Sequence, residues 1–288
     1  MEINFGFHSQ KNLLYWKKEF FMRKILFFFV VPVVPLLVSC GQKPASPDFV
    51  KDMKLVWSDE FNGESDCPNE ENWNWSEGAH GWGNGEIQNY TKERANSYVS
   101  DGTLKIKAAK DAKGKWTSAR LNSRWKKAFT YGYIEFKAKI PEQKGSWPAL
   151  WLLSDKAEYG QWPRSGEIDV MEHAPSTWQD KTYGSLHCRA GYGGNPVKSE
   201  YIIVKNIDKK WHTYGVRWTE DAITWYCDGK PYSEYQNPNQ GENDTSKWPF
   251  DKDFYIIINL AMGGSLGGSI PKDLDSCQME VDYVRWYQ

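Results

Sequence analysis

From residue 54 onward the chain is a series of short segments in which apolar and polar residues alternate, separated by Gly, Asn, Asp and Pro. Alternation with a period of two predicts strands with one buried face, whereas helices need a period of 3.6, which no long stretch shows. The alternating segments are "TLKIKAA" (103–109), "GYIEFKAKI" (132–140), "GEIDV" (166–170), "TYGVRW" (213–218), "ITWYCDG" (223–229), "FYIIINLAM" (254–262) and "MEVDYVRWY" (279–287).

Many short strands with turn residues between them favour an all-β sandwich. Asp-Gly inside "CDGKPY" (227–232) is typical of a hairpin turn. We predict one domain, residues 52–288, built from two packed antiparallel sheets, with a concave groove on the outer face of one sheet. A sandwich of this length is common as a single domain, and the sequence contains no internal repeat.

The N-terminal region has a different pattern, which predicts a targeting segment. Residues 25–38, "ILFFFVVPVVPLLV", form an apolar run that directly follows Arg23 and Lys24. A run of this length is shorter than a typical membrane-spanning helix and fits the apolar part of a signal peptide.

The apolar run ends in "LVSC", followed by Gly41. A small residue and then Cys resembles a bacterial lipobox, in which Cys40 becomes the lipidated N-terminus. We therefore expect residues 1–40 to hold an N-terminal extension and a lipoprotein signal peptide that starts at Met22, with residues 41–51 as a tether. This predicts a lipid-anchored protein of the bacterial cell envelope; an ordinary signal peptide and an uncleaved anchor are the alternatives.

Composition narrows the classes of partner. The 36 basic and 37 acidic residues nearly cancel, so no basic excess exists to bind nucleic acid. Aromatic residues are abundant, with 16 Trp, 16 Tyr and 13 Phe. We expect about half of the Trp side chains in the core, and the others can serve as flat apolar platforms for the C–H faces of sugar rings.

Four cysteines follow the signal segment: Cys67, Cys188, Cys227 and Cys277. An exported protein is in a compartment that permits disulfides, but the sequence cannot choose among the three possible pairings. The absence of a CxxC pair argues against zinc. Cys188 and Cys227 lie in strand-like runs, so buried free thiols are the simpler alternative for them.

The stretch "GEIDVMEHA" (166–174) contains three acids with irregular spacing. On a regular strand Glu167 and Asp169 share one face, and Glu172 falls on the other. One extra residue, a β-bulge, brings all three to the same face, and bulges are frequent beside active sites. We therefore predict a bulge at Met171, or at Val170 and Met171 together, with the acids facing the groove.

Three carboxylates on one face repel each other, which shifts their pKa values. Two carboxyl groups on either side of a sugar linkage are sufficient to cleave it, at about 5–5.5 Å for retention or about 6.5–9.5 Å for inversion of configuration. The spacing of these residues does not choose between the two. A solvated acidic face and a calcium site are the non-catalytic alternatives.

The motif "SGEIDVMEH" resembles the signature of glycoside hydrolase family 16 in its longer form, E-x-D-x-x-E, which laminarinases carry; lichenases have the shorter E-x-D-x-E. The resemblance covers about residues 54–288 in the order of the family. The other matching segments are "LVWSDEFNG" (55–63), "GWGNGEIQNYT" (81–91), "SARLNS" (118–123), "YGYIEFKAKIPEQKGSWPALWLLS" (131–154), "WHTYGVRWTEDAITWYCDGK" (211–230), "INLAMGG" (258–264) and "VDYVRWYQ" (281–288).

This resemblance implies a β-jelly-roll sandwich with an open cleft, retaining chemistry and internal cleavage of β-glucans or related galactans. Glu167 matches the nucleophile, Glu172 the general acid/base and Asp169 the acid between them. The expected partners for substrate are, in sequence order, Asn84, Glu86, Arg120, Trp147, Trp151, Trp162 and His187, with Asn84, Glu86 and Arg120 on the non-reducing side and His187 near the acid/base.

No cofactor is expected for catalysis. Many family members hold a structural calcium ion far from the cleft, and the matching positions are Glu60 and Gly102, through backbone carbonyls, and Asp282 through its side chain. Oxygen ligands of this kind suit calcium.

The resemblance implies a monomeric endo-β-glucanase acting on β-1,3- or mixed β-1,3/1,4-glucans such as laminarin and cereal β-glucan. Where many laminarinases have a Trp after "GG", this chain has "GGSLGGSI" (263–270), which weakens the preference for pure β-1,3-glucan. A galactan hydrolase of the agarase or porphyranase kind is the first alternative. A non-catalytic glycan-binding lipoprotein is the second, although all three acids are present.

Overall fold

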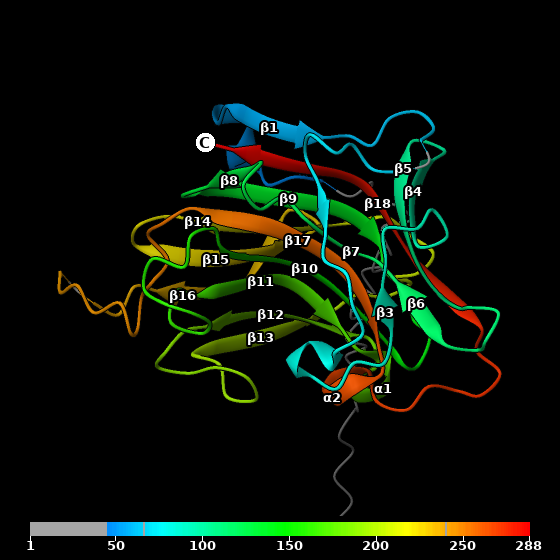
Figure 1. Cartoon of the computed structure of the whole chain (residues 1–288). Helices are drawn as coiled ribbons and strands as arrows, with labels where there is room; N and C mark the ends of the chain where they lie inside the picture. The colour runs from blue at the N-terminus through cyan, green and yellow to red at the C-terminus, as the bar shows by residue number, and fades with distance from the viewer. Residues whose placement is uncertain (1–44, 66, 240) are drawn as a thin grey trace, which may run out of the picture. The chain divides into compact units, whose positions relative to one another are not determined.

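The computed structural model describes residues 45–288, apart from residues 66 and 240 (Figure 1). The predicted signal peptide with its start at Met22, the lipidated Cys40 and the first part of the tether lie outside the described residues. Within the described part of the chain, no helix is long and apolar enough to cross a membrane.

Two large sheets account for nearly all of the described secondary structure. Sheet A has ten strands in the order β16-β15-β14-β9-β18-β5-β6-β3, with β1 beside β18 and β4 beside β5. Its strands are β1 (Leu55–Asp59), β3 (Asn89–Tyr90), β4 (Ser97–Ser100), β5 (Thr103–Lys110), β6 (Trp116–Ser118), β9 (Gly132–Lys139), β14 (His212–Trp218), β15 (Ala222–Cys227), β16 (Lys230–Gln236) and β18 (Ser276–Tyr287).

Sheet B has eight strands in the order β13-β12-β11-β10-β17-β7-β2, with β8 beside β17. Its pairs are antiparallel, as are those of sheet A except for β3 with β6. Its strands are β2 (Asn74–Trp75), β7 (Arg120–Asn122), β8 (Ala128–Phe129), β10 (Ser146–Ser154), β11 (Glu167–His173), β12 (Lys181–His187), β13 (Lys198–Ile203) and β17 (Phe254–Met262).

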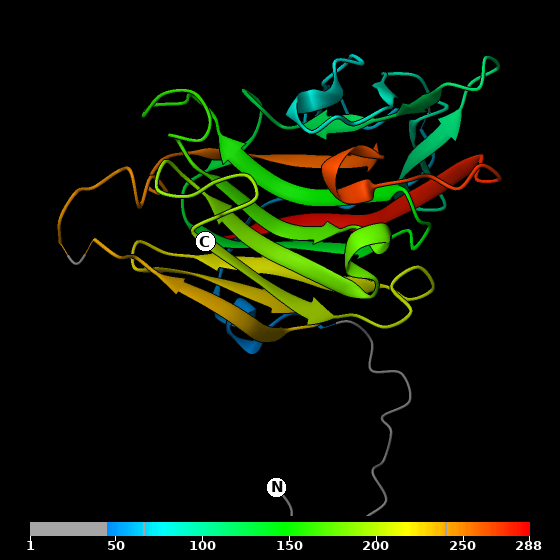
Figure 2. The same ribbon diagram turned by 90° about the horizontal axis from the view of Figure 1, so that it is seen from below.

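The described helices are short. The 3-10 helices are η1 (Asp48–Asp52) and η2 (Gly81–Gly83), and the α-helices are α1 (Pro175–Trp178) and α2 (Gly264–Gly267). Helices α1 and α2 contact each other and the ends of β10 and β17 (Figure 2). The two packed sheets confirm the predicted all-β sandwich.

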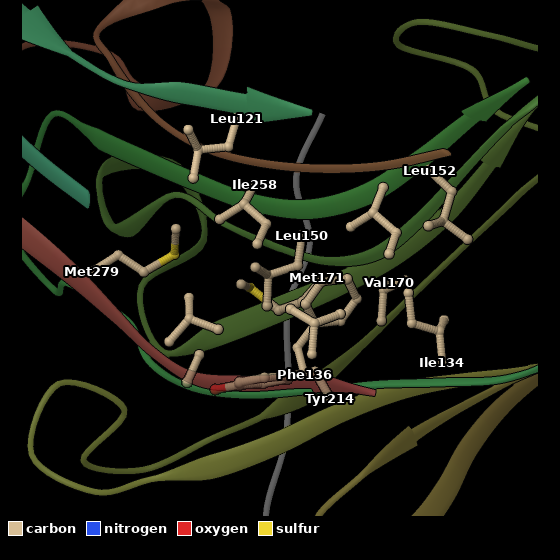
Figure 3. Packing of buried hydrophobic residues seen from close by; sticks show 14 of the residues in the cluster. Leu121, Ile134, Phe136, Leu150, Leu152, Val170, Met171, Tyr214, Ile258 and Met279 are labelled. Carbon is tan, nitrogen blue, oxygen red and sulfur yellow. The ribbon is translucent and has the colours of Figure 1, made fainter. Parts of the chain in front are cut away.

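The core lies between the sheets, where alternate residues of each strand meet (Figure 3). From sheet B it receives Leu150 and Leu152 of β10 and Ile258 of β17, and from sheet A Ile134 and Phe136 of β9. Fully burying a side chain of this kind stabilises the fold by roughly 1.5–3 kcal/mol. The intervening residues of sheet B therefore point to its outer face, which is where the acids lie.

The end of the predicted tether packs against the predicted domain. The hydroxyl of Ser46 donates to Oε1 of the buried Glu135 at 2.6 Å, and Tyr133 and Tyr283 donate to the same carboxylate. The Phe49 ring packs edge-on against Tyr133. A buried carboxylate needs donors, and the segment from residue 45 supplies one of them.

All four cysteines of the described residues are free thiols. Cys188, Cys227 and Cys277 are buried, which confirms the simpler alternative for the first two. Burial raises the pKa of Cys277 to about 12, so this thiol is unreactive at neutral pH.

Candidate active site

The predicted bulge is present in β11. Against β12, Asp169 lies opposite Ser185 and Glu172 lies opposite Tyr183, so two residues of β11 face Gly184 alone. Against β10, the register also shifts by one residue between Asp169 and Met171. The extra residue therefore belongs to the pair Val170 and Met171.

Both residues of the bulged pair point inward. Val170 and Met171 are about 1% exposed and pack in the core between the sheets (Figure 3). Because these two successive residues both point inward, the next residue, Glu172, points outward on the same side as Glu167 and Asp169. The structure thus brings the three predicted catalytic acids to the outer face of sheet B.

Each outer acid accepts a hydrogen bond from a tryptophan. Nε1 of Trp147 donates to Oε1 of Glu172 at 3.0 Å, and Nε1 of Trp162 donates to Oε2 of Glu167 at 2.7 Å. Trp147 is almost buried, whereas Trp162 is 50% exposed beside the acids. The two indoles therefore orient the two carboxylates that a double-displacement reaction needs.

His187 lies opposite Glu167 in the sheet. Its Nε2 atom is 3.1 Å from Oδ2 of Asp169 and 3.9 Å from Oε1 of Glu167. The charge of His187 also lowers the pKa of Glu172, so His187 lies within electrostatic reach of all three acids. Register explains this placement, since Glu167 lies directly opposite His187 and the bulge keeps Glu172 on the same face.

Burial and mutual repulsion act together on the acids. Burial, followed by the charge of Asp169, raises the pKa of Glu167 well above its ordinary value. Burial and the charge of Glu172 do the same to Asp169, and burial raises the pKa of Glu172. The hydrogen bonds from Trp162 and Trp147 oppose these shifts. The cluster therefore holds protons at a pH where isolated carboxyl groups have lost them.

A polar network lies to one side of the acids. Asn84 donates to Oε1 of Glu86 at 3.1 Å, and Tyr90 donates to Oε2 of the same buried carboxylate at 3.1 Å. Asn259 then donates to the Tyr90 hydroxyl at 3.1 Å and accepts from Nε1 of Trp151 at 2.7 Å. This network links Asn84 and Glu86 to Trp151, which lies far from them in the sequence.

Arg120 completes the same side of the site. Its guanidinium carbon lies 4.7 Å from the ring centroids of both Trp82 and Trp151, and its Nε atom is buried without a protein partner among the described residues. A planar cation between two indoles is held firmly. Arg120 is thus held in place beside the polar network.

Several further residues of this face were not predicted from the sequence. Asn259 had a detectable signal, because it is the single amide in the apolar run "FYIIINLAM". Trp82 and Tyr90 lie inside the matched segment "GWGNGEIQNYT" without a distinguishing pattern.

A hollow of about 360 Å³ on sheet A contains none of the predicted site residues. It is lined by Met53, Tyr131, Gly132, Arg217, Trp218, Thr219, Glu220 and Gln288.

The predicted calcium positions converge on one stretch of β18. Strand β1 ends beside Val284 and β5 begins near Val281, so Glu60 and Gly102 both approach residue 282 from the same edge. Asp282 is itself the extra residue of a bulge against β9. Its Oδ2 atom lies 2.6 Å from Nζ of Lys137. The oxygen ligand types fit calcium, while the carboxylate is already paired with an ammonium group.

Comparison with known proteins decides the family. The model of glycosyl hydrolases family 16 matches residues 84–285. The chain belongs to this family. The match spans β11 with its three acids and the strands of sheet B on both sides of it, so the acid cluster described above lies within the family domain.

One relative and two solved structures are similar to this family 16 chain over nearly their whole length. A β-glucanase of Rhodothermus marinus is 37% identical over 93% of this chain and 95% of its own. The crystal structure of a laminarinase from the same organism has a TM-score of 0.77 at 38% identity, covering 82% of this chain and 97% of its own. SCLam, a non-specific endo-β-1,3(4)-glucanase co-crystallised with an oligosaccharide, has a TM-score of 0.77 at 33% identity, covering 86% and 98%. These structures confirm the predicted jelly-roll class.

Proposed function

We propose that this family 16 enzyme is an endo-β-glucanase that hydrolyses β-1,3-glucans and mixed β-1,3/1,4-glucans. The observation that carries the proposal is the bulge of β11, which places Glu167, Asp169 and Glu172 on one face, the outer two with indole donors. The named activities of the relatives supply the substrate class.

The positions of the acids suggest their roles in a double displacement. Glu167 attacks the anomeric carbon while Glu172 gives its proton to the departing oxygen, which forms a glycosyl-enzyme ester. Glu172 then takes a proton from water, whose oxygen displaces Glu167 and restores the enzyme. Burial raises the pKa of Glu172, which helps this acid to keep its proton, while the charge of the almost buried Asp169 raises the pKa of Glu167.

Polymer digestion tests this proposal. Residues 41–288 should release oligosaccharides from laminarin and from cereal β-glucan, and Glu167→Gln should abolish nearly all turnover. The matched control is Glu93→Gln, which changes an exposed carboxyl group away from the acids and should leave activity intact. If both glucans stay intact while a sulfated galactan is cut, the glucan assignment is wrong.

Product stereochemistry tests the retaining mechanism. NMR of the first product should show the same anomer as the substrate, and azide should restore activity to Glu172→Ala by forming a β-glycosyl azide. An inverted anomer contradicts the role given to Glu167. A non-catalytic binding protein, the second alternative, would bind glucan without turnover in the wild type.

We also propose a structural calcium ion at Glu60, Gly102 and Asp282. The support is the convergence of these positions at one stretch of β18 and the oxygen chemistry of the site. Calcium should raise the melting temperature of the chelator-treated protein, and Asp282→Asn should remove this response. An identical calcium response in Asp282→Asn contradicts the site.

Export and lipidation are the last part of the proposal. Its support is the sequence "LVSC" and the apolar run before it, which predict a monomer held at the bacterial cell envelope by a lipid on Cys40. Mass spectrometry of the protein from the membrane fraction should find the lipid, and Cys40→Ser should release the protein. Detection of an unprocessed N-terminus contradicts lipidation.

A further inference from the structure

An aromatic cluster lies on the side of the acids opposite to the polar network. Trp178 of α1 and Tyr183 of β12 have ring centroids 4.3 Å apart, and Tyr183 and Tyr201 of β13 have centroids 5.5 Å apart. Nζ of Lys181 lies 4.1 Å from the Tyr201 centroid. We call Trp178, Tyr183 and Tyr201 the tyrosine platform.

Register connects this platform with the catalytic face. Glu172 lies directly opposite Tyr183, and Tyr183 lies directly opposite Tyr201. Residues directly opposite each other in antiparallel strands share a face, so both rings stand on the side of sheet B that bears Glu172. Strands β11, β12 and β13 are consecutive neighbours (Figure 1), which puts Tyr201 roughly 10 Å from Glu172 at the backbone.

Tyr201, Tyr183 and Glu172 form a row across the strands, and this row continues beyond Glu172 in the other direction. From Glu172 it passes through Ala149 and Asn259 to Arg120 on β7. The acid/base thus stands between two surfaces: the polar network with Arg120 and its two indoles, and the tyrosine platform that begins at Tyr183. A glucan laid across the strands contacts the first surface with one end and the second with the other.

The exposure of the platform argues for a ligand. Tyr201 is 42% exposed, and Ile203, on the same face of β13, is 51% exposed. Large exposed side chains of this kind, gathered beside a reactive group, are typical of binding surfaces. The faces of a β-linked glucopyranose ring carry C–H groups, and an aromatic ring with a polar hydroxyl and a nearby ammonium group suits both the face and the hydroxyls of such a sugar.

We propose that the tyrosine platform binds the sugar rings on the leaving-group side of the scissile bond. This rests on the proposed function, in which Asn84, Glu86 and Arg120 hold the non-reducing side and Glu172 protonates the departing oxygen. The platform begins at the ladder neighbour of Glu172 and extends away from Arg120. It therefore holds the part of the chain that departs, and it supplies the surface on which an acceptor sugar competes with water.

The position of cleavage in a β-1,3-gluco-hexasaccharide labelled at its reducing end tests on which side of the scissile bond the platform binds. Weaker binding of leaving-side sugars favours binding modes with more sugars on the other side, so Tyr201→Ala should move cleavage toward the reducing end. Tyr201→Phe keeps the ring and should keep the wild-type pattern. Movement toward the non-reducing end, or an unchanged pattern, overturns the proposal. A merely structural role lowers the rate without moving the cut.

Two substrates separate binding from chemistry. On laminarin, kcat/KM of Tyr201→Ala should fall between about threefold and tenfold, the loss of one aromatic contact. An aryl β-laminaribioside has no sugar on the leaving side, so its kcat/KM should change less than about twofold. The control Tyr98→Ala, on sheet A, should leave both unchanged. Equal losses of kcat/KM on both substrates overturn the proposal. A wild-type protein that cleaves neither substrate contradicts the proposed function on which the proposal rests.

Discussion

The indole of Trp225, on β15 of sheet A, donates to the backbone carbonyl of Asp169 on sheet B at a distance of 2.8 Å. Trp225 is fully buried, and the hydrogen bond crosses the sandwich to the start of the bulge, where the β11 ladder is interrupted. An interrupted ladder needs another donor. A core side chain of the opposite sheet therefore helps to hold the middle acid of the cluster in place.

Trp225→Phe should weaken both the fold and catalysis. The variant leaves the Asp169 carbonyl without this donor in the core, which costs roughly 1–3 kcal/mol of unfolding free energy. A shift of Asp169 should also lower kcat by about tenfold or more, because catalytic geometry tolerates little displacement. Urea unfolding and laminarin kinetics measure the two effects. Wild-type kcat in a destabilised variant would show that Trp225 only packs.

Gly184 lies opposite the bulged pair, at a position where no side chain fits. A Cβ atom at this position would lie 2.3 Å from Cδ1 of Trp225 and 2.7 Å from the Tyr232 hydroxyl. Gly184→Ala should therefore reduce the unfolding free energy by about 1–3 kcal/mol, the usual cost of overpacking. Gly194→Ala is the matched control, since nothing lies within 4 Å of its Cβ position. Equal unfolding midpoints in urea would contradict the tight contact.

The two indole donors should set opposite limbs of the pH–activity profile. Trp147 lowers the pKa of Glu172 by its hydrogen bond, so Trp147→Phe should raise that pKa. The acid then stays protonated to higher pH, and the basic limb of kcat/KM moves upward. Trp162→Phe should instead raise the pKa of Glu167 and move the acidic limb upward. The same limb moving in both variants would contradict the assigned roles.

Glu167→Gln should stabilise the protein at neutral pH. The folded pKa of Glu167 is raised, whereas Glu in an unfolded chain titrates near about 4.3. The folded state therefore binds more protons, and the unfolding free energy of the wild type falls as pH rises above about 4.3 toward the folded pKa. The melting temperature of the variant should exceed that of the wild type at pH 7 and meet it near pH 4. A constant difference at all pH values would exclude this linkage.

Removing residues 45–53 should destabilise the domain. The truncation deletes the Ser46 donor to the buried Glu135 and the Phe49 ring that packs on Tyr133, and losses of this kind amount to roughly 2–4 kcal/mol. The melting temperature should fall by several degrees relative to a protein that begins at residue 45. Equal melting temperatures would show that these contacts add nothing to the stability of the domain.

The sequence by itself determined the two-sheet class and the bulge. Alternation along β15 and β18 defined which faces are buried, because side chains of a strand alternate. The same rule made the late position of Glu172 in "GEIDVMEHA" a detectable irregularity. Local spacing was sufficient for these features, since each depends on residues within one strand.

Only the tertiary structure decided which residues from different strands meet. Trp225 reaches Asp169 from the other sheet, Asn259 joins Tyr90 to Trp151, and Tyr201 stands in register with Glu172 through Tyr183. Strand order and register set these contacts, and neither can be inferred from the hydrophobic pattern of a single strand. The same reason applies to His187, which faces Glu167 across the ladder and lies 3.1 Å from Asp169. Its position along β12 was visible in the sequence, whereas the partner it faces across the ladder was not.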